Sequence, residues 1–132
     1  MCIFCEIING NIPNYKIYED EVCMAFLDIS QATIGHTLIV PKTHFENIFE
    51  LDEQVMEHLG KIVVKLSKHL KNTLGLSALN VLNNNGVNAG QTVNHFHIHL
   101  IPRYNDSDLT IHFNSNELSK EDFNNLLNKI KL

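Results

Sequence analysis

The longest periodic stretch of apolar residues predicts one long helix between Asp52 and Leu74. Its apolar positions recur at spacings of three and four residues, at Val55, Leu59, Ile62, Val63, Leu66 and Leu70. This spacing places them on one face of an α-helix. Gly75 follows as a C-cap, because glycine readily adopts the left-handed conformation that ends many helices. We expect His58 and His69 to lie at the flank of the apolar face, in solvent.

Short apolar runs with turn residues between them predict five strands. The runs lie at residues 15–19, 22–27, 36–41, 78–83 and 95–101. The acidic turn from Glu19 to Glu21 joins the first two as a hairpin, and Pro41 ends the third because proline donates no backbone hydrogen bond. A short helical turn is expected from Phe4 to Asn9. This order of elements predicts an α+β fold, in which one long helix covers a five-stranded antiparallel sheet.

Three histidines at alternate positions dominate the last predicted strand. In a strand, His95, His97 and His99 share one face, while Phe96, Ile98 and Leu100 occupy the other. Neutral imidazole is available as a base or nucleophile near neutral pH. Two chemistries are therefore open: the three imidazoles hold a catalytic Zn²⁺, or one imidazole nitrogen attacks phosphorus and forms a covalent phosphoramidate.

Composition restricts the class of protein. The 132 residues suit one domain, and a net charge of −5 argues against tight binding to nucleic-acid polymers. No apolar run approaches the roughly 20 residues that span a bilayer, so we expect no membrane segment. The N-terminal residues do not resemble a secretion signal, which leads us to expect a cytoplasmic protein.

The cysteines add a second candidate site. Cys2 and Cys5 form a C-x-x-C pair, which in a reducing compartment indicates metal or redox chemistry, whereas Cys23 lies in an apolar run as a buried thiol. One such pair supplies two of the four ligands of a structural zinc ion. The alternative is a pair of unligated thiols.

The segment before the histidines is rich in glycine and amide side chains. Residues 84–94 contain Gly86 and Gly90 together with Asn84, Gln91 and Thr92. Such a composition suits close approach of the backbone to phosphate oxygens, although an ordinary loop can look similar.

The segment from His95 to Ile101 resembles the signature of the histidine triad (HIT) family, His-φ-His-φ-His-φ-φ with φ hydrophobic. Residues 4–8, 25–30, 35–44 and 84–103 also match the family pattern in the same order. The resemblance implies a HIT domain over residues 2–108 with a HIT-like fold. Residues 109–132 lie outside it as a tail, and their apolar spacing predicts a C-terminal helix.

The resemblance implies a nucleotide hydrolase or transferase that cleaves a substituent from the α-phosphate of a nucleoside monophosphate. His97 would be the nucleophile that takes the nucleotidyl group, and His99 and His36 would face the phosphate oxygens. Asn84, Gln91 and Thr92 would bind the phosphate or aid the leaving group, and Asp28 would accept hydrogen bonds from the ribose hydroxyls. The apolar walls of the base pocket would be Phe4, Ile7, Phe26, Leu27 and Ile29, which could equally be core residues.

Asn84 resembles the residue that the Hint-like branch of the family carries at this position. Enzymes of the Fhit branch carry glutamine there instead. The expected reaction is therefore hydrolysis of purine nucleoside phosphoramidates. Two alternatives are a dinucleoside polyphosphate hydrolase and a nucleotide-binding regulatory or scaffold protein. The tail lacks the tryptophan-containing segment of animal Hint proteins, since the chain has no tryptophan.

Bacterial members with an N-terminal cysteine pair imply a structural Zn²⁺ held by Cys2, Cys5, His44 and His95. That arrangement would leave His97 free to react with phosphorus. The family resemblance further implies a homodimer whose two sheets join into one.

Overall fold

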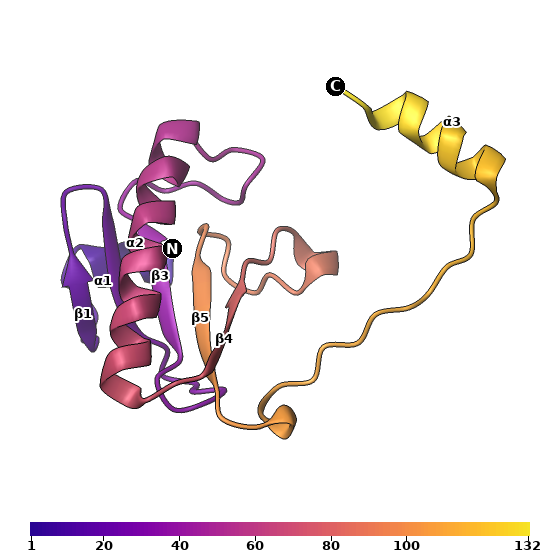
Figure 1. Cartoon of the computed structure of the whole chain (residues 1–132). Helices are drawn as coiled ribbons and strands as arrows, with labels where there is room; N and C mark the ends of the chain where they lie inside the picture. The colour runs from indigo at the N-terminus through magenta and orange to yellow at the C-terminus, as the bar shows by residue number, and fades with distance from the viewer.

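The computed structural model describes residues 1–132, and its centre is an antiparallel sheet with a helix on each face (Figure 1). The strands are β1 (Lys16–Glu19), β2 (Cys23–Leu27), β3 (Thr37–Pro41), β4 (Ala78–Leu82) and β5 (Ile98–Arg103). They lie in the order β1-β2-β3-β5-β4, and every neighbouring pair is antiparallel. The helices are α1 (Ile3–Ile8), α2 (Glu53–Leu74) and α3 (Lys120–Ile130). The predicted α+β fold is confirmed.

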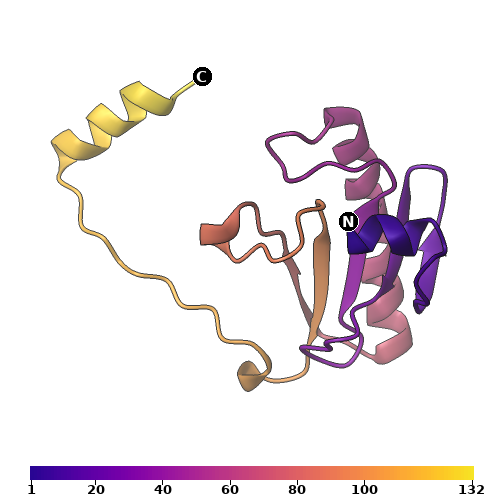
Figure 2. The ribbon, with the colours of Figure 1, turned by 180° about the vertical axis from the view of Figure 1, so that it is seen from behind.

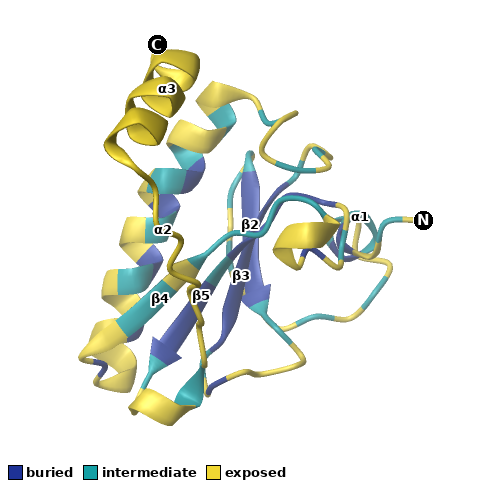
Figure 3. Ribbon diagram, turned by 90° about the vertical axis from the view of Figure 1, so that its right-hand side faces the viewer, coloured by how far each residue is buried: buried dark blue, intermediate teal, exposed yellow.

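Helix α2 covers one face of the sheet through the apolar stripe that its sequence predicts. Asp52 caps its first turn by accepting hydrogen bonds from the amides of Gln54 and Val55, and Gly75 ends it at φ +69°. Its buried side chains are Leu59, Ile62, Leu66 and Leu70. They pack in one cluster with Phe96, Ile98 and Leu100, the residues between and beyond the histidines. Figure 3 shows this buried side of α2 facing the sheet.

The opposite face of the sheet carries α1, which lies in front of the strands when the molecule is seen from behind (Figure 2). Phe4 and Ile7 of α1 pack with Met24, Phe26, Leu38 and Val40 in a second apolar cluster. Because both faces of β2 and β3 are covered, these strands are apolar at nearly every position rather than at alternate ones.

The last strand starts later than the sequence predicts. It begins at Ile98 instead of His95, because the Phe96 amide donates to the carbonyl of Phe45 at 2.7 Å and Asn83 Nδ2 donates to the carbonyl of His97 at 2.8 Å. These backbone groups are therefore bonded outside the ladder. The strand also runs through Pro102 to Arg103, where it pairs only with β4.

The expectation of two solvated histidines on α2 is wrong for His58. Its Nε2 lies 2.6 Å from Asp20 Oδ2 in the turn between β1 and β2, and 32% of its side chain remains exposed. His69 lies in solvent as expected. His58 therefore connects the long helix to the hairpin.

Beyond β5 the chain leaves the body of the protein. Residues 109–119 contain no helix or strand, and they carry α3 to a position well away from the sheet (Figures 1 and 2). The predicted C-terminal helix is present, and none of its residues is buried. No helix in the structure has the length and apolar character needed to cross a bilayer.

Candidate functional site

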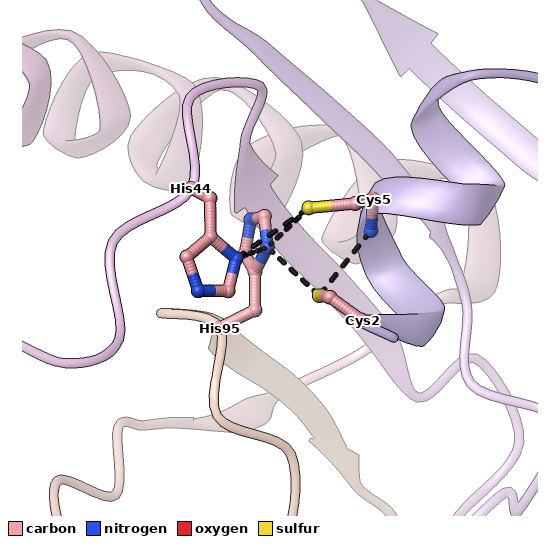
Figure 4. A group of neighbouring side chains, drawn as sticks. All are labelled: Cys2, Cys5, His44 and His95. Carbon is pink, nitrogen blue, oxygen red and sulfur yellow. Dashed lines mark hydrogen bonds between the residues drawn. The ribbon is translucent and has the colours of Figure 1, made fainter.

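Two cysteines and two histidines converge between α1, the loop after β3 and the segment before β5 (Figure 4). Cys2 caps the N-terminus of α1, and Cys5 lies one turn later. His44 follows β3 by three residues, and His95 is fully buried ahead of β5. The donor atoms of all four side chains lie within 4.8 Å of one another. These four residues could hold a metal ion, as the family resemblance implies.

The donor spacing fits a tetrahedral ion. His95 Nδ1 lies 3.3 Å from Cys2 Sγ, 3.5 Å from Cys5 Sγ and 3.1 Å from His44 Nδ1, and Cys5 Sγ lies 3.4 Å from His44 Nδ1. Zinc–sulfur bonds of about 2.3 Å and zinc–nitrogen bonds of about 2.0–2.1 Å give tetrahedron edges of about 3.5 Å (sulfur–nitrogen) and about 3.3 Å (nitrogen–nitrogen). The donor set is thus arranged at almost the separations that a bound zinc ion requires.

The second nitrogen of His95 fixes the direction of the first. His95 Nε2 donates to the carbonyl of Pro41 at 2.8 Å, so the lone pair of the neutral ring is on Nδ1 and faces the two sulfurs. Burial lowers the pKa of His95 and keeps it neutral. Burial and the neighbouring Cys2 raise the pKa of Cys5, a tendency that a bound cation would reverse.

His97 lies on the side of the sheet that carries α1. Its Nδ1 is hydrogen-bonded within the chain, whereas its Nε2 is not. His97 is 5% exposed, and its Nδ1 donates to the carbonyl of His95 at 2.7 Å. The lone pair of the neutral ring is therefore on Nε2, and burial lowers the pKa of His97, which favours that neutral form. The Phe4 ring meets His97 edge to face at 5.0 Å between centroids. Such an imidazole nitrogen can act as a nucleophile.

His36 and His99 form a hydrogen-bonded pair beside His97. The Ala32 amide donates to His36 Nδ1 at 3.1 Å, which leaves the proton of His36 on Nε2. His36 Nε2 lies 2.9 Å from His99 Nδ1 and donates to it, so neutral His99 carries its own proton on Nε2. Burial lowers the pKa of His36, and burial together with the neighbouring His97 and His36 lowers that of His99 to about 4. The pair thus offers a neutral N–H donor near His97, whose ring centroid is 4.9 Å from that of His99.

An apolar pocket lies between α1 and the end of β2. The five residues that the sequence assigns to apolar walls all line it: Phe4, Ile7, Phe26, Leu27 and Ile29. Asp28 lies in the same lining, and its Oδ2 is 3.6 Å from His36 Nε2 while its Oδ1 accepts from the Ser30 amide. Asp28 therefore connects the apolar pocket to the histidine pair.

The polar loop before the histidines is held together by Gln91. This side chain is buried; its Nε2 donates to the carbonyls of Glu46 and Val93, and its Oε1 accepts from the Gly86 amide. Gln91 thereby shapes the loop in the free protein. The side chains of Asn84 and Thr92, by contrast, make no hydrogen bond within the chain; Asn84 is half-buried and Thr92 is exposed, so their donors remain available to a ligand.

Asn83 is a residue that the sequence interpretation missed. Its bond to the His97 carbonyl fixes the backbone at the candidate nucleophile. The only signal was the run of three asparagines from 83 to 85, which does not distinguish the residue that faces the histidines from its neighbours.

Comparison with known proteins agrees with this geometry, and the HIT domain profile matches residues 9–106. The chain belongs to the HIT family. This HIT protein is 50% identical to protein hit of Bacillus subtilis over 107 residues, which cover 81% of the chain and 74% of that relative. It is 40% identical to adenosine 5′-monophosphoramidase hnt1 of Schizosaccharomyces pombe, covering 80% of the chain and 76% of the relative. It is also 40% identical to adenylylsulfatase HINT3 of Arabidopsis thaliana, covering 77% of the chain but 52% of that protein.

Solved structures confirm the fold of the HIT protein. A HIT family protein of Bacillus anthracis superposes with a TM-score of 0.92 at 46% identity, covering 98% of the chain and 94% of that structure. A protein of Streptococcus mutans gives 0.93 at 42% identity, covering 98% and 83%. A zinc-bound histidine triad protein of Mycobacterium smegmatis gives 0.78 at 33% identity, covering 87% and 84%.

Proposed function

We propose that this HIT protein hydrolyses purine nucleoside phosphoramidates through a covalent nucleotidyl-His97 intermediate. The observation that supports this most directly is the state of His97, a neutral imidazole whose Nδ1–H is bonded to the carbonyl of His95 and whose Nε2 carries the lone pair. The His36–His99 pair supplies a donor beside it. The apolar pocket and Asp28 complete a site with the chemistry of a nucleoside monophosphate.

The reaction proceeds in two displacements at the α-phosphorus. The lone pair on His97 Nε2 forms a nitrogen–phosphorus bond as the bond from phosphorus to the leaving nitrogen breaks, and that nitrogen takes a proton from solvent water and departs as the amine. Water then attacks the same phosphorus, which releases the nucleoside monophosphate and returns the pair of electrons to His97. Splitting one displacement into two lowers each barrier. Charge on the phosphate oxygens is offset by hydrogen bonds from His99 Nε2 and from the free side chains of Asn84 and Thr92.

The remaining parts of the nucleotide match the remaining parts of the site. The ribose hydroxyls donate to the carboxylate of Asp28, since two adjacent hydroxyls can bond to one carboxylate. The purine base packs in the apolar pocket against Phe4 and Phe26, the rings of which meet edge to face at 5.7 Å. The two relatives whose names state an activity, a monophosphoramidase and an adenylylsulfatase, both act on adenosine nucleotides.

We further propose that the ion at the four-residue centre is a structural Zn²⁺. Thiolate and imidazole ligands in a tetrahedral set are typical of zinc, and all four ligand positions come from protein side chains, which leaves none open for catalysis. The ion would connect α1, the loop after β3 and the segment before β5. His97 is two residues from His95, so this connection would hold the nucleophile in place. Reduced thiolates also suit a cytoplasmic location.

The oligomer we propose is a homodimer joined at β4. This strand forms one edge of the sheet and presents unpaired backbone groups together with Val81, which is 54% exposed. The net charge of −5 disfavours a nucleic-acid polymer as a partner, whereas a single nucleotide can bind at the local site.

A substrate panel tests the proposed reaction. Purified protein is supplied with an adenosine phosphoramidate, adenosine 5′-phosphosulfate, and diadenosine tri- and tetraphosphate, and product release is measured for each. Alkaline denaturing quench preserves a phosphoramidate bond, so mass spectrometry of peptides then locates the nucleotidyl group. We expect the phosphoramidate to be the best substrate and the adduct to be on His97. His97→Ala should abolish turnover, while His69→Ala on the exposed side of α2 should not change it.

The alternatives give different results in the same panel. Preference for the diadenosine substrates with the same adduct would identify a dinucleoside polyphosphate hydrolase. Binding of adenosine monophosphate without any turnover would identify a nucleotide-binding protein. Turnover without an adduct, lost on treatment with a chelator, would identify a zinc hydrolase and overturn the role of His97.

A further inference from the structure

Helix α3 is a well-formed amphipathic helix whose apolar face has no partner in its own chain. Ser119 and Asp122 form a capping box at its start, and Phe123, Leu126, Leu127 and Ile130 recur at helical spacing. These four side chains are 44–64% exposed. An isolated helix of this length is marginal in water unless its apolar face is packed against another surface.

Beyond Leu109, the segment before α3 makes no hydrogen bond to the body of the chain. The last hydrogen bond between them is that from Arg103 Nη2 to the carbonyl of Leu109, and residues 110–118 make none. Figures 1 and 3 show that this extended segment and α3, together the C-terminal arm (residues 109–132), lie on the β4 side of the sheet. The ribbon of the arm runs apart from that of β4, and every residue from 110 to 132 is exposed.

Solved relatives hold this arm in the same place. The arm makes up 24 of the 132 residues. If it did not superpose, the TM-scores could not reach the observed 0.92 and 0.93 over 98% of the chain, so the arm superposes as well. An arm without contacts in its own chain adopts one position in crystals of different proteins only if something else fixes it. A second copy of the chain is the one partner that every such crystal contains.

We propose that the C-terminal arm is exchanged between two copies of this chain, so that α3 of each copy packs its apolar face on the body of the other. The inference rests on the proposed homodimer and extends it. A second copy joined at the β4 edge would occupy the space between that edge and the arm. Twofold symmetry makes the contact reciprocal, so both arms and both β4 edges are covered in one closed assembly.

Full-length variants of the α3 surface test the exchange. Leu127→Asp adds a charge to the apolar face, and Asn125→Asp adds the same charge to the polar face. The substitution removes a buried apolar side chain from both of the symmetric α3 contacts in the dimer. We therefore expect Leu127→Asp to raise the dimer dissociation constant at least about 10-fold in sedimentation equilibrium. Asn125→Asp should leave it unchanged. At concentrations at which both variants are monomeric, the two should unfold at the same temperature, since α3 does not contact the body of its own chain.

Photo-crosslinking identifies the chain that α3 contacts. A benzophenone amino acid in place of Phe123 should give a covalent dimer on a denaturing gel, and the same group in place of Asn125 should give much less. Crosslinks confined to one chain, or a dimer insensitive to Leu127→Asp, would overturn the exchange while leaving the proposed homodimer and its catalysis intact. A monomeric wild type would overturn both the exchange and the homodimer, with no bearing on the adduct at His97.

Discussion

His36 Nε2 and His99 Nδ1 lie 2.9 Å apart and connect the start of β3 to β5 within the sheet. Because the Ala32 amide occupies His36 Nδ1, only one arrangement of protons satisfies both rings. His99 is thereby left with its proton on Nε2. A backbone amide in the loop before β3 thus decides which ring nitrogen of a histidine on β5 carries a proton that can be donated.

Removing the donor to His99 should reduce activity. We expect His36→Ala to leave the Nε2 proton of His99 unfixed, and so to lower kcat/KM for an adenosine phosphoramidate about 100-fold, the usual effect of losing one aligned donor to transition-state charge. His36→Gln should retain more activity, because a glutamine amide can place an N–H near the position of His36 Nε2. Steady-state kinetics of the two variants provide the comparison. Equal losses, with equal melting temperatures, would argue against the role of the bond.

Acid should destabilise the fold through His99. Burial, and then the charges of His97 and His36, lower the pKa of His99 from 6.5 to about 4, and Asp28 only partly opposes this. The folded protein keeps His99 neutral, whereas the unfolded chain binds a proton below pH 6.5. Its contribution to stability is full above pH 6.5 and is lost as the pH falls toward 4.

The melting temperature of the wild type should therefore fall more than that of His99→Gln when the pH is lowered from about 7 to about 5, by a difference of about 3 °C. Differential scanning calorimetry measures both. Identical slopes would show that His99 does not titrate in this way. His69→Ala, in solvent, should follow the wild type.

The sequence predicts the elements of this fold because their signals are local. Helical spacing in α2 and alternation from Phe96 to Leu100 each depend on neighbouring residues, and both were confirmed. The start of β5 was predicted wrongly because the backbone just before it bonds to the Phe45 carbonyl and the Asn83 side chain, both distant in the sequence. His58 was misplaced for the same reason, since its partner Asp20 is 38 residues distant.

The four residues that could hold a metal ion were predicted as a set, and the family resemblance rather than the spacing selected its members. What the sequence does not contain is the direction of each ring. His95 presents Nδ1 to the sulfurs because its Nε2 donates to the carbonyl of Pro41. This carbonyl becomes a neighbour of His95 only when the fold brings β3 and the segment before β5 together.

The metal should depend on residues of the four-ligand set alone. We expect one zinc per chain by elemental analysis, lost in Cys5→Ala and His95→Ala, because the three remaining donors bind much more weakly than four. His99→Gln and Cys23→Ala should retain the zinc, since neither residue belongs to the set. Loss of metal in His99→Gln would indicate a catalytic ion on the triad instead. Absence of metal from the wild type would refute the site.

Asp20 should be a major contributor to stability. Its carboxylate accepts from His58 Nε2, the Tyr18 hydroxyl and the amides of Val22 and Cys23. Burial opposes ionisation, but these bonds outweigh it and hold the pKa of Asp20 well below its usual value. We expect Asp20→Ala to lower the free energy of unfolding by about 2–4 kcal/mol and His58→Ala by about 1 kcal/mol.

Urea denaturation of these variants and of the double variant gives the coupling between Asp20 and His58, which lie in direct contact and should not contribute additively. His69→Ala on the same helix serves as the control, with a change within about 0.5 kcal/mol. Additive effects would mean that His58 contributes little through this bond.

Asn83 should act on catalysis by positioning His97. Its Nδ2 donates to the His97 carbonyl at 2.8 Å, and a misplaced nucleophile loses rate while substrate binding is retained. We expect Asn83→Asp, which keeps the shape but loses the donor, to lower kcat about 10-fold with little change in KM. Asn72→Asp, exposed at the end of α2, adds the same charge without touching the site and should behave as the wild type. A rise in KM at constant kcat would instead place Asn83 in substrate binding, because a positioning residue changes the reaction step rather than the affinity.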